Sequence, residues 1–247
     1  MKAAYFISDV HLGVSPAGSV QEREKHLTNF LKELEGKATH LFIVGDLFEF
    51  WYEYNFYAPS LHFKILRALA DLKDSGCEIK LIKGNHDFAY GIFFERELGI
   101  ETCSHIVAEL HGRRVYICHG DGLARTDGSY RFFRKVLDFK PNRFLFKWLH
   151  PDIGMRLALS VGSNSRDFNK KKRIPEEEYL PKIREIMQKN GCDTFVHGHN
   201  HCGGLWKVPE GVIINSGQWL FEENYSCISQ KNCYFYASLS AELSSAC

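Results

Sequence analysis

The chain has 247 residues, of which 45% are hydrophobic and 25% charged, an ordinary composition for a soluble globular protein with room for one large or two small domains. Its formal net charge of +1 excludes a generally basic or acidic protein, so any basic surface must be local. No apolar run approaches the roughly 18 residues of a membrane span, and the first residues do not resemble a signal peptide. The eight cysteines include no C-x-x-C pair, so we expect reduced, mostly buried thiols in a cytoplasmic protein.

Strand-like and helical patterns alternate in the first third of the chain. Helices are predicted at 20–36 and 60–76, where apolar residues recur at helical spacing and a glycine ends each pattern. Strands are predicted at 3–8, 40–44, 78–82, 114–118, 193–197, 211–215, 225–229 and 233–237. This order predicts an α/β layered fold, in which the last three strands have short links and finish the sheet in antiparallel fashion.

Residues 122–175 interrupt this pattern. The segment is aromatic and basic and has helical periods but no strand, which predicts a helical cap insertion within one domain spanning 1–247. Between 131 and 150 six Lys or Arg residues stand against one acid, Asp138, and alternate with phenylalanines and Trp148. Such a stretch suits an anionic membrane surface, a lid whose aromatic rings pack on the body, or a single-stranded nucleic acid.

Polar side chains follow several predicted strands, in the blocks "SDVHLG", "GDLFEFW", "GNHD", "CHGDG" and "HGHNH". The candidate ligands in these blocks are Asp9, His11, Asp46, Asn85, His119, His199 and His201. Taken singly, a D-x-H or GNHD block is compatible with a turn, and an Asp with a helix cap. Ligands of open α/β sheets bind outside the carboxyl ends of the strands, so we expect the blocks to converge on one site.

The residue types in these blocks favour a metal site. A mixture of Asp, His and Asn suits Mn²⁺, Fe or Zn²⁺. Because alternate residues of an extended segment point the same way, Asp9 and His11 are predicted to hold one ion together, and the same spacing applies to His199 and His201. Metal-binding cysteines are the less favoured interpretation, and Cys202, next to the histidines of "HGHNH", is the one cysteine considered for such a role.

The five blocks resemble the signature blocks of the calcineurin-like metallophosphoesterase superfamily, and "NSGQW" after the sixth strand fits as well. The resemblance implies a two-sheet β-sandwich flanked by helices, with a dinuclear metal centre at one edge. It implies that the first ion is held by Asp9, His11, Asp46 and His201. It implies that the second ion is held by Asp46, Asn85, His119 and His199, so that Asp46 bridges the two.

Two divalent ions about 3.5–4 Å apart can share one hydroxide, which attacks phosphorus, and can clamp the attacking and leaving oxygens. We expect two divalent ions, Mn²⁺ first and Fe or Zn²⁺ as alternatives. His86 is not in the ligand set, and by its position it is expected to face the phosphate, where it stabilises charge in the transition state or protonates the leaving oxygen. Asp87 is expected to orient His86.

Longer stretches narrow the resemblance. "GDLFEFWYEY", "HGDGLARTDGSYRFFRKVL" and "FKWLHPDIGMRLA" are similar to the UDP-2,3-diacylglucosamine diphosphatase family of lipid A synthesis. That family cleaves a pyrophosphate to give UMP and 2,3-diacylglucosamine 1-phosphate (lipid X), typically with Mn²⁺, beneath an insertion that holds the acyl chains. Substrate contacts carried over from it are Asn85, His86, Asp127, Tyr130, Ser165, Asn169 and Lys172. Its better-known members have arginine where this chain has His86, so the resemblance is to a histidine-bearing branch.

Two alternatives stay open from the sequence. A metal-dependent phosphodiesterase, nuclease or nucleotide pyrophosphatase of the same superfamily would carry the same blocks, whereas a non-catalytic scaffold would lack some of the seven ligands, all of which are present. The resemblance implies a glycolipid nucleotide substrate, a cytoplasmic location and peripheral contact with the inner face of a membrane. Neither a nucleic acid nor a protein partner is predicted.

Overall fold

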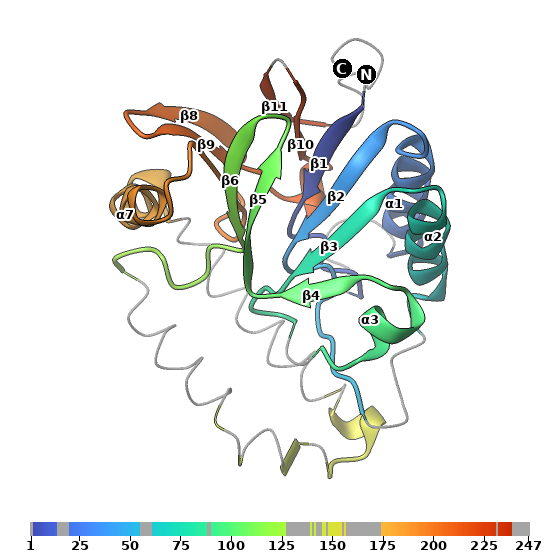
Figure 1. The fold of residues 1–247 in the computed structure, drawn as a ribbon. Coiled ribbons are helices and arrows are strands. Elements are labelled where there is room, and N and C mark those ends of the chain that lie inside the picture. Colours follow the sequence, from blue (N-terminus) through green and yellow to red (C-terminus); the bar gives the residue numbers. More distant parts are fainter. Residues whose placement is uncertain are drawn as a thin grey trace.

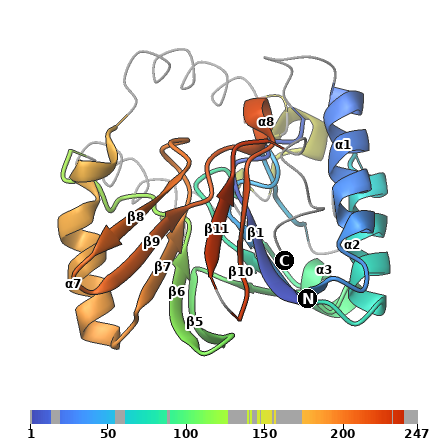
Figure 2. The ribbon, with the colours of Figure 1, turned by 90° about the horizontal axis from the view of Figure 1, so that it is seen from above.

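Two β-sheets packed face to face form the centre of the protein, and helices cover their outer faces (Figure 1, Figure 2). The computed structural model describes residues 2–13, 20–54, 61–87, 90–126, 139, 141, 145–146, 148–154, 156, 174–230 and 232–238. The predicted α/β architecture of two sheets flanked by helices is confirmed.

The first sheet has six strands in the order β11-β10-β1-β2-β3-β4. Its parallel part consists of β1 (Ala3–Ile7), β2 (Ala38–Val44), β3 (Glu78–Ile82) and β4 (Glu101–Cys103). On the other side of β1, β10 (Tyr225–Ile228) and β11 (Cys233–Tyr236) continue the sheet in antiparallel fashion. Because β1, β2 and β3 are parallel, their carboxyl ends lie along one edge.

The second sheet has five strands in the order β5-β6-β7-β9-β8. Its strands are β5 (His105–Leu110), β6 (Arg113–Cys118), β7 (Thr194–His197), β8 (Gly204–Val208) and β9 (Gly211–Asn215). β6, β7 and β9 run parallel, whereas β5 and β8 are antiparallel to their neighbours. A second set of carboxyl ends therefore lies at one edge of this sheet.

Side chains of β1 show how the layers are held together. Successive residues of a strand point to opposite faces. Tyr5 and Ile7 accordingly lie in the core beneath the helices, while Ala4 and Phe6 lie in the core between the two sheets. All four are buried, so burial on both faces fixes the register of β1.

Helices α1 (Val20–Glu33) and α2 (Phe63–Asp74) cover the first sheet, and α7 (Leu180–Asn190) covers the second (Figure 2). α7 has a proline in its first turn and ends at Gly191, which has the left-handed conformation common after helix ends. Shorter helical segments are α3 (Phe93–Glu97), α8 (Trp219–Glu222) and the 3₁₀ turn η1 (Glu176–Glu178). η1 leads into α7, which begins two residues later.

The strand and helix predictions were right in most places. β4, β5, β8, α3, α7 and α8 were not predicted, and all of them except β5 and α7 are five residues long or shorter. The last three predicted strands do not finish one sheet: β9 belongs to the second sheet, and only β10 and β11 form an antiparallel pair. Seven cysteines in the described ranges are free, and Cys77, Cys118, Cys192 and Cys227 are buried.

Most of the predicted insertion, 122–175, lies outside the described residues, and its extent stays a prediction. The described part includes helical turns at 145–146 and 151–154, where Gly154 N donates to the His150 carbonyl at 3.0 Å. One aromatic ring of this part packs on the body, since Phe146 lies 4.8 Å from Tyr52 between ring centroids. Among the described residues, no helix is long and apolar enough to cross a bilayer.

Candidate metal centre

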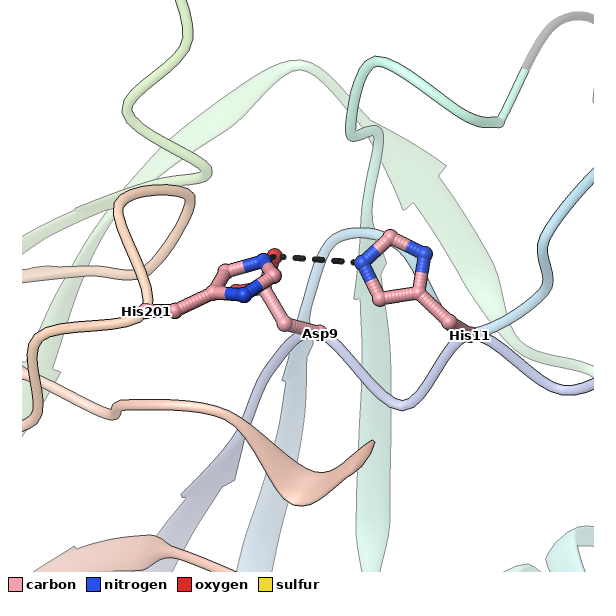
Figure 3. Close-up of side chains that lie close together, drawn as sticks. All are labelled: Asp9, His11 and His201. Atoms are coloured by element: carbon pink, nitrogen blue, oxygen red, sulfur yellow. Dashed lines mark ion pairs between the residues drawn. The ribbon is translucent and has the colours of Figure 1, made fainter. Parts of the chain in front are cut away.

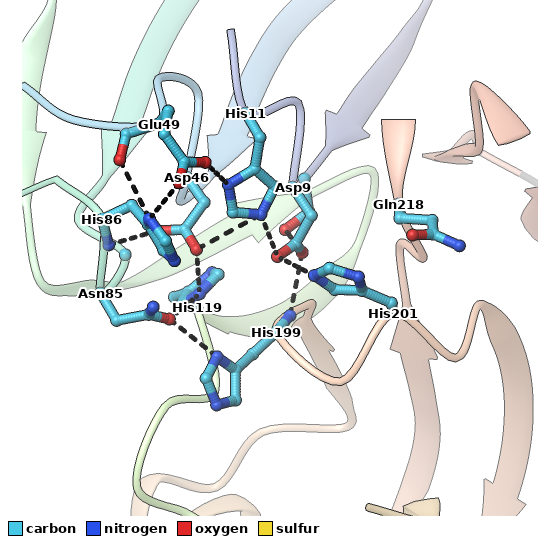
Figure 4. A network of polar contacts seen from close by, with 12 residues as sticks. Asp9, His11, Asp46, Glu49, Asn85, His86, His119, His199, His201 and Gln218 are labelled. Carbon is cyan, nitrogen blue, oxygen red and sulfur yellow. Dashed lines mark hydrogen bonds and ion pairs between the residues drawn. The ribbon is translucent and has the colours of Figure 1, made fainter. Parts of the chain in front are cut away.

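Loops at the carboxyl ends of β1, β2, β3, β6 and β7 bring the seven candidate ligands together (Figure 4). Asp9 and His11 follow β1, Asp46 follows β2, and Asn85 follows β3. The second sheet contributes His119 after β6 and the two histidines after β7, His199 and His201. The ligands are thus separated along the chain but adjacent in space, as the strand-end argument predicts.

Asp9, His11 and His201 form the first group of side chains (Figure 3). Asp9 Oδ1 lies 3.1 Å from His201 Nε2 and 3.6 Å from His11 Nε2. Asp9 and His11 are almost completely buried, whereas His201 is partly exposed, so the group opens to solvent on the His201 side.

Asn85, His119 and His199 form the second group. The Asn85 Oδ1 atom lies 3.1 Å from His119 Nε2 and 2.9 Å from His199 Nδ1. His119 donates its Nδ1 proton to the Val44 carbonyl at 2.8 Å, which leaves Nε2 to face the group. A backbone acceptor on the far nitrogen is the usual arrangement for a metal-binding histidine.

Asp46 lies between the two groups. Its Oδ2 atom is 3.8 Å from His11 Nε2 and 3.3 Å from His119 Nε2, so one carboxylate oxygen faces a histidine of each group. Its Oδ1 atom accepts a hydrogen bond from His86 N at 2.8 Å. Asp46 therefore lies between a histidine of the first group and a histidine of the second.

The backbone at the ligands is left-handed. Positive φ angles between 48° and 73° occur at Asp9, His11, Asp46, His199 and His201. Non-glycine residues in this region are uncommon and concentrate at functional sites, with a cost of order 1 kcal/mol or more each. Asp9 and His11 do lie together as predicted, but the reason given for it, an extended segment, was wrong: each side chain reaches the site from a left-handed turn.

Neighbouring loops hold the first of these turns in place. The amides of Val10 and His11 donate to the Asp46 carbonyl at 3.0 and 2.9 Å. At the start of α8, Trp219 N donates to the carbonyl of Ser8 at 3.0 Å. The "NSGQW" segment thus contributes to the site through its backbone, although it supplies none of the predicted ligands.

Two observations show that the residues fit divalent metal ions. Asp9 Oδ1 and His11 Nε2 are buried, and apart from the ion pairs among the candidate ligands neither has a hydrogen-bond partner. Three sets of potential ligand atoms lie within 4.8 Å of one another, namely Asp9–His11–His201, His11–Asp46–His86 and Asp9–Asp46–His119. Mixed carboxylate and imidazole donors suit Mn²⁺, Fe or Zn²⁺.

The charges of the cluster are strongly coupled. Burial alone would raise the pKa of Asp9, but His201 and His11 lower it well below its ordinary value. Burial would lower the pKa of His11, yet Asp9 and Glu49 raise it to about 10. Negative carboxylates thus attract positive charge to the centre of the site, which a proton or a metal ion can supply.

Glu49 is a functional residue that the sequence reasoning missed. Its buried carboxylate has Oε2 at 3.1 Å from His11 Nδ1, the nitrogen opposite the one that faces Asp9. Its backbone carbonyl accepts a hydrogen bond from His86 Nδ1 at 3.0 Å. The acidic residue in "GDLFEFW", three positions after Asp46, was the available signal.

The contacts of Asp87 differ from those predicted. Asp87 Oδ2 accepts hydrogen bonds from the backbone amides of Asp46 at 2.8 Å and Gly84 at 2.9 Å. Burial and the nearby charge of Asp46 raise the pKa of Asp87 to about 6. Asp87 thus holds the backbone turn of Asp46, and the contact that orients His86 comes from Glu49.

Of the predicted substrate contacts, Asn85 and His86 lie in the described part of the chain. Asp127, Tyr130, Ser165, Asn169 and Lys172 lie outside the described residues. Asn85 and His86 lie in the cluster, where the His86 side chain keeps 18% of its surface exposed. His197, from the same block as His199, points away into a separate buried network with Glu176.

The chain is similar in sequence to bacterial proteins named UDP-2,3-diacylglucosamine hydrolase. The chain is 32% identical to a UDP-2,3-diacylglucosamine hydrolase of Porphyromonas gingivalis, over 90% of this chain and 92% of the relative. The Escherichia coli K12 protein of that name is 35% identical over 81% and 82%, and the Neisseria meningitidis serogroup B protein 31% over 89% and 90%. A solved archaeal phosphodiesterase shares the fold, with a TM-score of 0.50, 10% identity and coverage of 95% and 98%.

The fold and the site together define a hydrolase of the metallophosphoesterase class. The family model for calcineurin-like phosphoesterases matches residues 4–203, which include every candidate ligand. The chain belongs to the calcineurin-like phosphoesterase family.

Proposed function

We propose that the chain hydrolyses the diphosphate of UDP-2,3-diacylglucosamine to UMP and 2,3-diacylglucosamine 1-phosphate. The supporting observation is that relatives named for this substrate are 31–35% identical over 81–90% of the chain. This similarity accompanies a complete set of clustered Asp, His and Asn side chains.

These clustered side chains would hold two divalent metal ions, with Mn²⁺ as the first choice. Asp9, His11, Asp46 and His201 would hold one ion, and Asp46, Asn85, His119 and His199 the other; the position of Asp46 between the two groups supports this division. When bound, such ions lower the pKa of a coordinated water and neutralise charge on phosphate oxygens.

His86 would act on the phosphate side of the site. Its Nδ1 proton is committed to the carbonyl of Glu49, so Nε2 is the nitrogen left to face a substrate. The ring also packs edge-on against His11, with centroids 4.7 Å apart at 88°, which restricts its rotation. Only the doubly protonated ring carries a proton at Nε2 as well; that form would stabilise charge in the transition state or donate its Nε2 proton to the leaving oxygen, against the burial that lowers the pKa of His86.

The acyl chains would contact the insertion. Leu145, Trp148 and Ile153 are 65%, 78% and 58% exposed, while Phe146 packs against Tyr52 in the loop after β2. These exposed apolar side chains, next to the ring of Phe146 that packs on the body, are suited to contact acyl chains and the inner face of a membrane. Asp127, Tyr130, Ser165, Asn169 and Lys172 are proposed to bind the rest of the substrate.

The test is direct assay of the purified protein with Mn²⁺. UDP-2,3-diacylglucosamine should yield UMP, while UDP-N-acetylglucosamine and bis(p-nitrophenyl) phosphate should turn over far more slowly. Trp148→Ala should raise KM for the acylated substrate and leave the slow diester cleavage unchanged. Rapid cleavage of the diester with no UMP from the acylated nucleotide would contradict the proposal.

A further inference from the structure

A second buried polar network lies beneath the loop that carries His199 and His201. Its centre is the carboxylate of Glu176 in η1, a residue only 5% exposed. Glu176 Oε1 lies 2.8 Å from His197 Nε2, and Oε2 accepts hydrogen bonds from Asn200 Nδ2 at 2.9 Å and Asn215 Nδ2 at 3.2 Å. One carboxylate therefore binds three side chains, from the ends of strands β7 and β9 and from the loop after β7.

Asn200 connects this network to the candidate metal ligands. It stands between His199 and His201, whose φ angles are 73° and 59°, and its own side chain is buried. Besides donating to Glu176, its Oδ1 atom accepts from Asn215 Nδ2 at 2.6 Å and from Cys202 N at 3.0 Å. The side chain thus anchors the loop from below.

The other two partners tie the loop to neighbouring strand ends. His197 is the last residue of β7, and its ring stacks on Tyr179 with centroids 5.7 Å apart. Asn215 is the last residue of β9, and its Oδ1 atom accepts from Gly217 N at 3.0 Å. The network therefore ties the start of the loop at His197 and its middle at Asn200 to the end of the adjacent strand β9.

An ionised carboxylate suits the centre of this network. Burial would raise the pKa of Glu176, but His197 and the two asparagine amides hold it below its ordinary value. A buried carboxylate without such partners would be strongly unfavourable. A glutamine in its place would lose the negative charge that the three partners face, and its N–H groups would have to turn toward His197, whose Nδ1 already faces the Gly198 carbonyl at 3.1 Å.

We infer that Glu176 is a positioning residue for metal binding, which acts through Asn200 to hold His199 and His201 in their left-handed conformations. The inference rests on the proposed function in one respect, namely that these two histidines bind metal. Outer-shell partners of metal ligands typically contribute about 10- to 100-fold to metal affinity. Glu176 differs from most such partners because it supports two ligands, one of each group, without touching either.

The test measures Mn²⁺ binding to the metal-free full chain by the electron paramagnetic resonance signal of free Mn²⁺, with no substrate present. Glu176→Gln should raise the Kd for Mn²⁺ by about 10- to 100-fold, and raising the Mn²⁺ concentration in a separate assay with substrate should recover most of the UMP release. Glu177→Gln is the matched control, because Glu177 is exposed in the same turn and the charge change is identical. A folded Glu176→Gln variant with the wild-type Kd would overturn the inference.

Asn200→Ala is a second test, which can be read even if Glu176→Gln is unstable at the assay temperature, and it should weaken Mn²⁺ binding to a similar degree. Where both single variants fold, the double variant should bind Mn²⁺ no more weakly than Glu176→Gln alone, because both substitutions remove the same Glu176–Asn200 contact. Additive losses would overturn the inference. Wild-type protein that binds Mn²⁺ but releases no UMP would remove the proposed substrate and leave the inference standing, whereas wild-type protein that binds no Mn²⁺ would remove both.

Discussion

Replacing Glu49 should weaken the metal centre in graded steps. The Glu49 carboxylate is buried and faces His11 Nδ1 at 3.1 Å, while His11 Nε2 faces Asp9 and Asp46. The carboxylate therefore selects the tautomer and ring orientation that present Nε2 to an ion. Glu49→Gln keeps the shape and one acceptor but loses the charge, whereas Glu49→Ala removes the contact altogether.

The magnitude follows from the type of hydrogen bond. A hydrogen bond to a charged group contributes about 1.5–3 kcal/mol and a neutral one about 0.5–1.5 kcal/mol. The difference of about 1 kcal/mol corresponds to a factor of about five in the Kd for metal. Glu49→Ala should cost about 10- to 100-fold, the usual effect of removing an outer-shell partner.

Metal titration of the metal-free variants distinguishes these steps. Glu53→Gln is the matched control, since Glu53 lies in the same loop and accepts hydrogen bonds from Trp51 Nε1 and Phe93 N but contacts neither His11 nor His86 in the described structure. Both Glu49 variants should also lose turnover, because the Glu49 carboxylate lies 3.6 Å from His86 Nδ1 as well, through its Oε1 atom. If Glu49→Ala bound Mn²⁺ as tightly as Glu53→Gln, the carboxylate would have no role in orienting His11.

Four further results are expected. Asp46→Ala should abolish turnover and weaken binding of both ions, by more than the about 100-fold of an outer-shell change. Chelation should inactivate the protein and lower its Tm, with Mn²⁺ restoring both. Phe42→Ala, which removes a ring stacked 5.1 Å from Phe6 between the sheets, should lower the free energy of unfolding in urea by about 3–5 kcal/mol, while Phe221→Ala at a half-exposed site changes it little. Gly84→Ala should reduce metal affinity, because the new Cβ would collide with Asp46.

The sequence was sufficient to predict which residues gather at the site. Asp46, Asn85 and His119 each follow a buried strand, and parallel strands place their carboxyl ends together whatever the details of packing. Chain order and residue type therefore carry this information locally. The backbone conformation that brings these side chains together was harder to predict. The left-handed turns at Asp9 and His11 depend on hydrogen bonds that this segment donates to the loop after β2.

Supporting residues were harder to predict for a physical reason. Glu49, Asp87 and Glu176 act through side-chain directions that exist only after two loops from different strands have met. Asp87 lies beside His86 in sequence, yet its carboxylate turns to the amides of Asp46 and Gly84. Adjacency along the chain thus suggested a partner that the folded loop does not provide.

The glycines of the sequence blocks explain why the five blocks together predict the site more specifically than any single block does. A Cβ on Gly84 would meet Asp46 Oδ1, one on Gly45 would meet the ring of His119, and one on Gly198 would meet the side chains of Ser8 and Asp9. In each case the glycine of one block makes room for a side chain from another block. A larger residue at that position would collide with this side chain, whatever the conformation of the turn itself. A single block can arise in an ordinary turn, where no such neighbour exists. The blocks occur together because the glycine at one strand end leaves room for the side chain that follows another strand, in two of the three cases a strand of the other sheet.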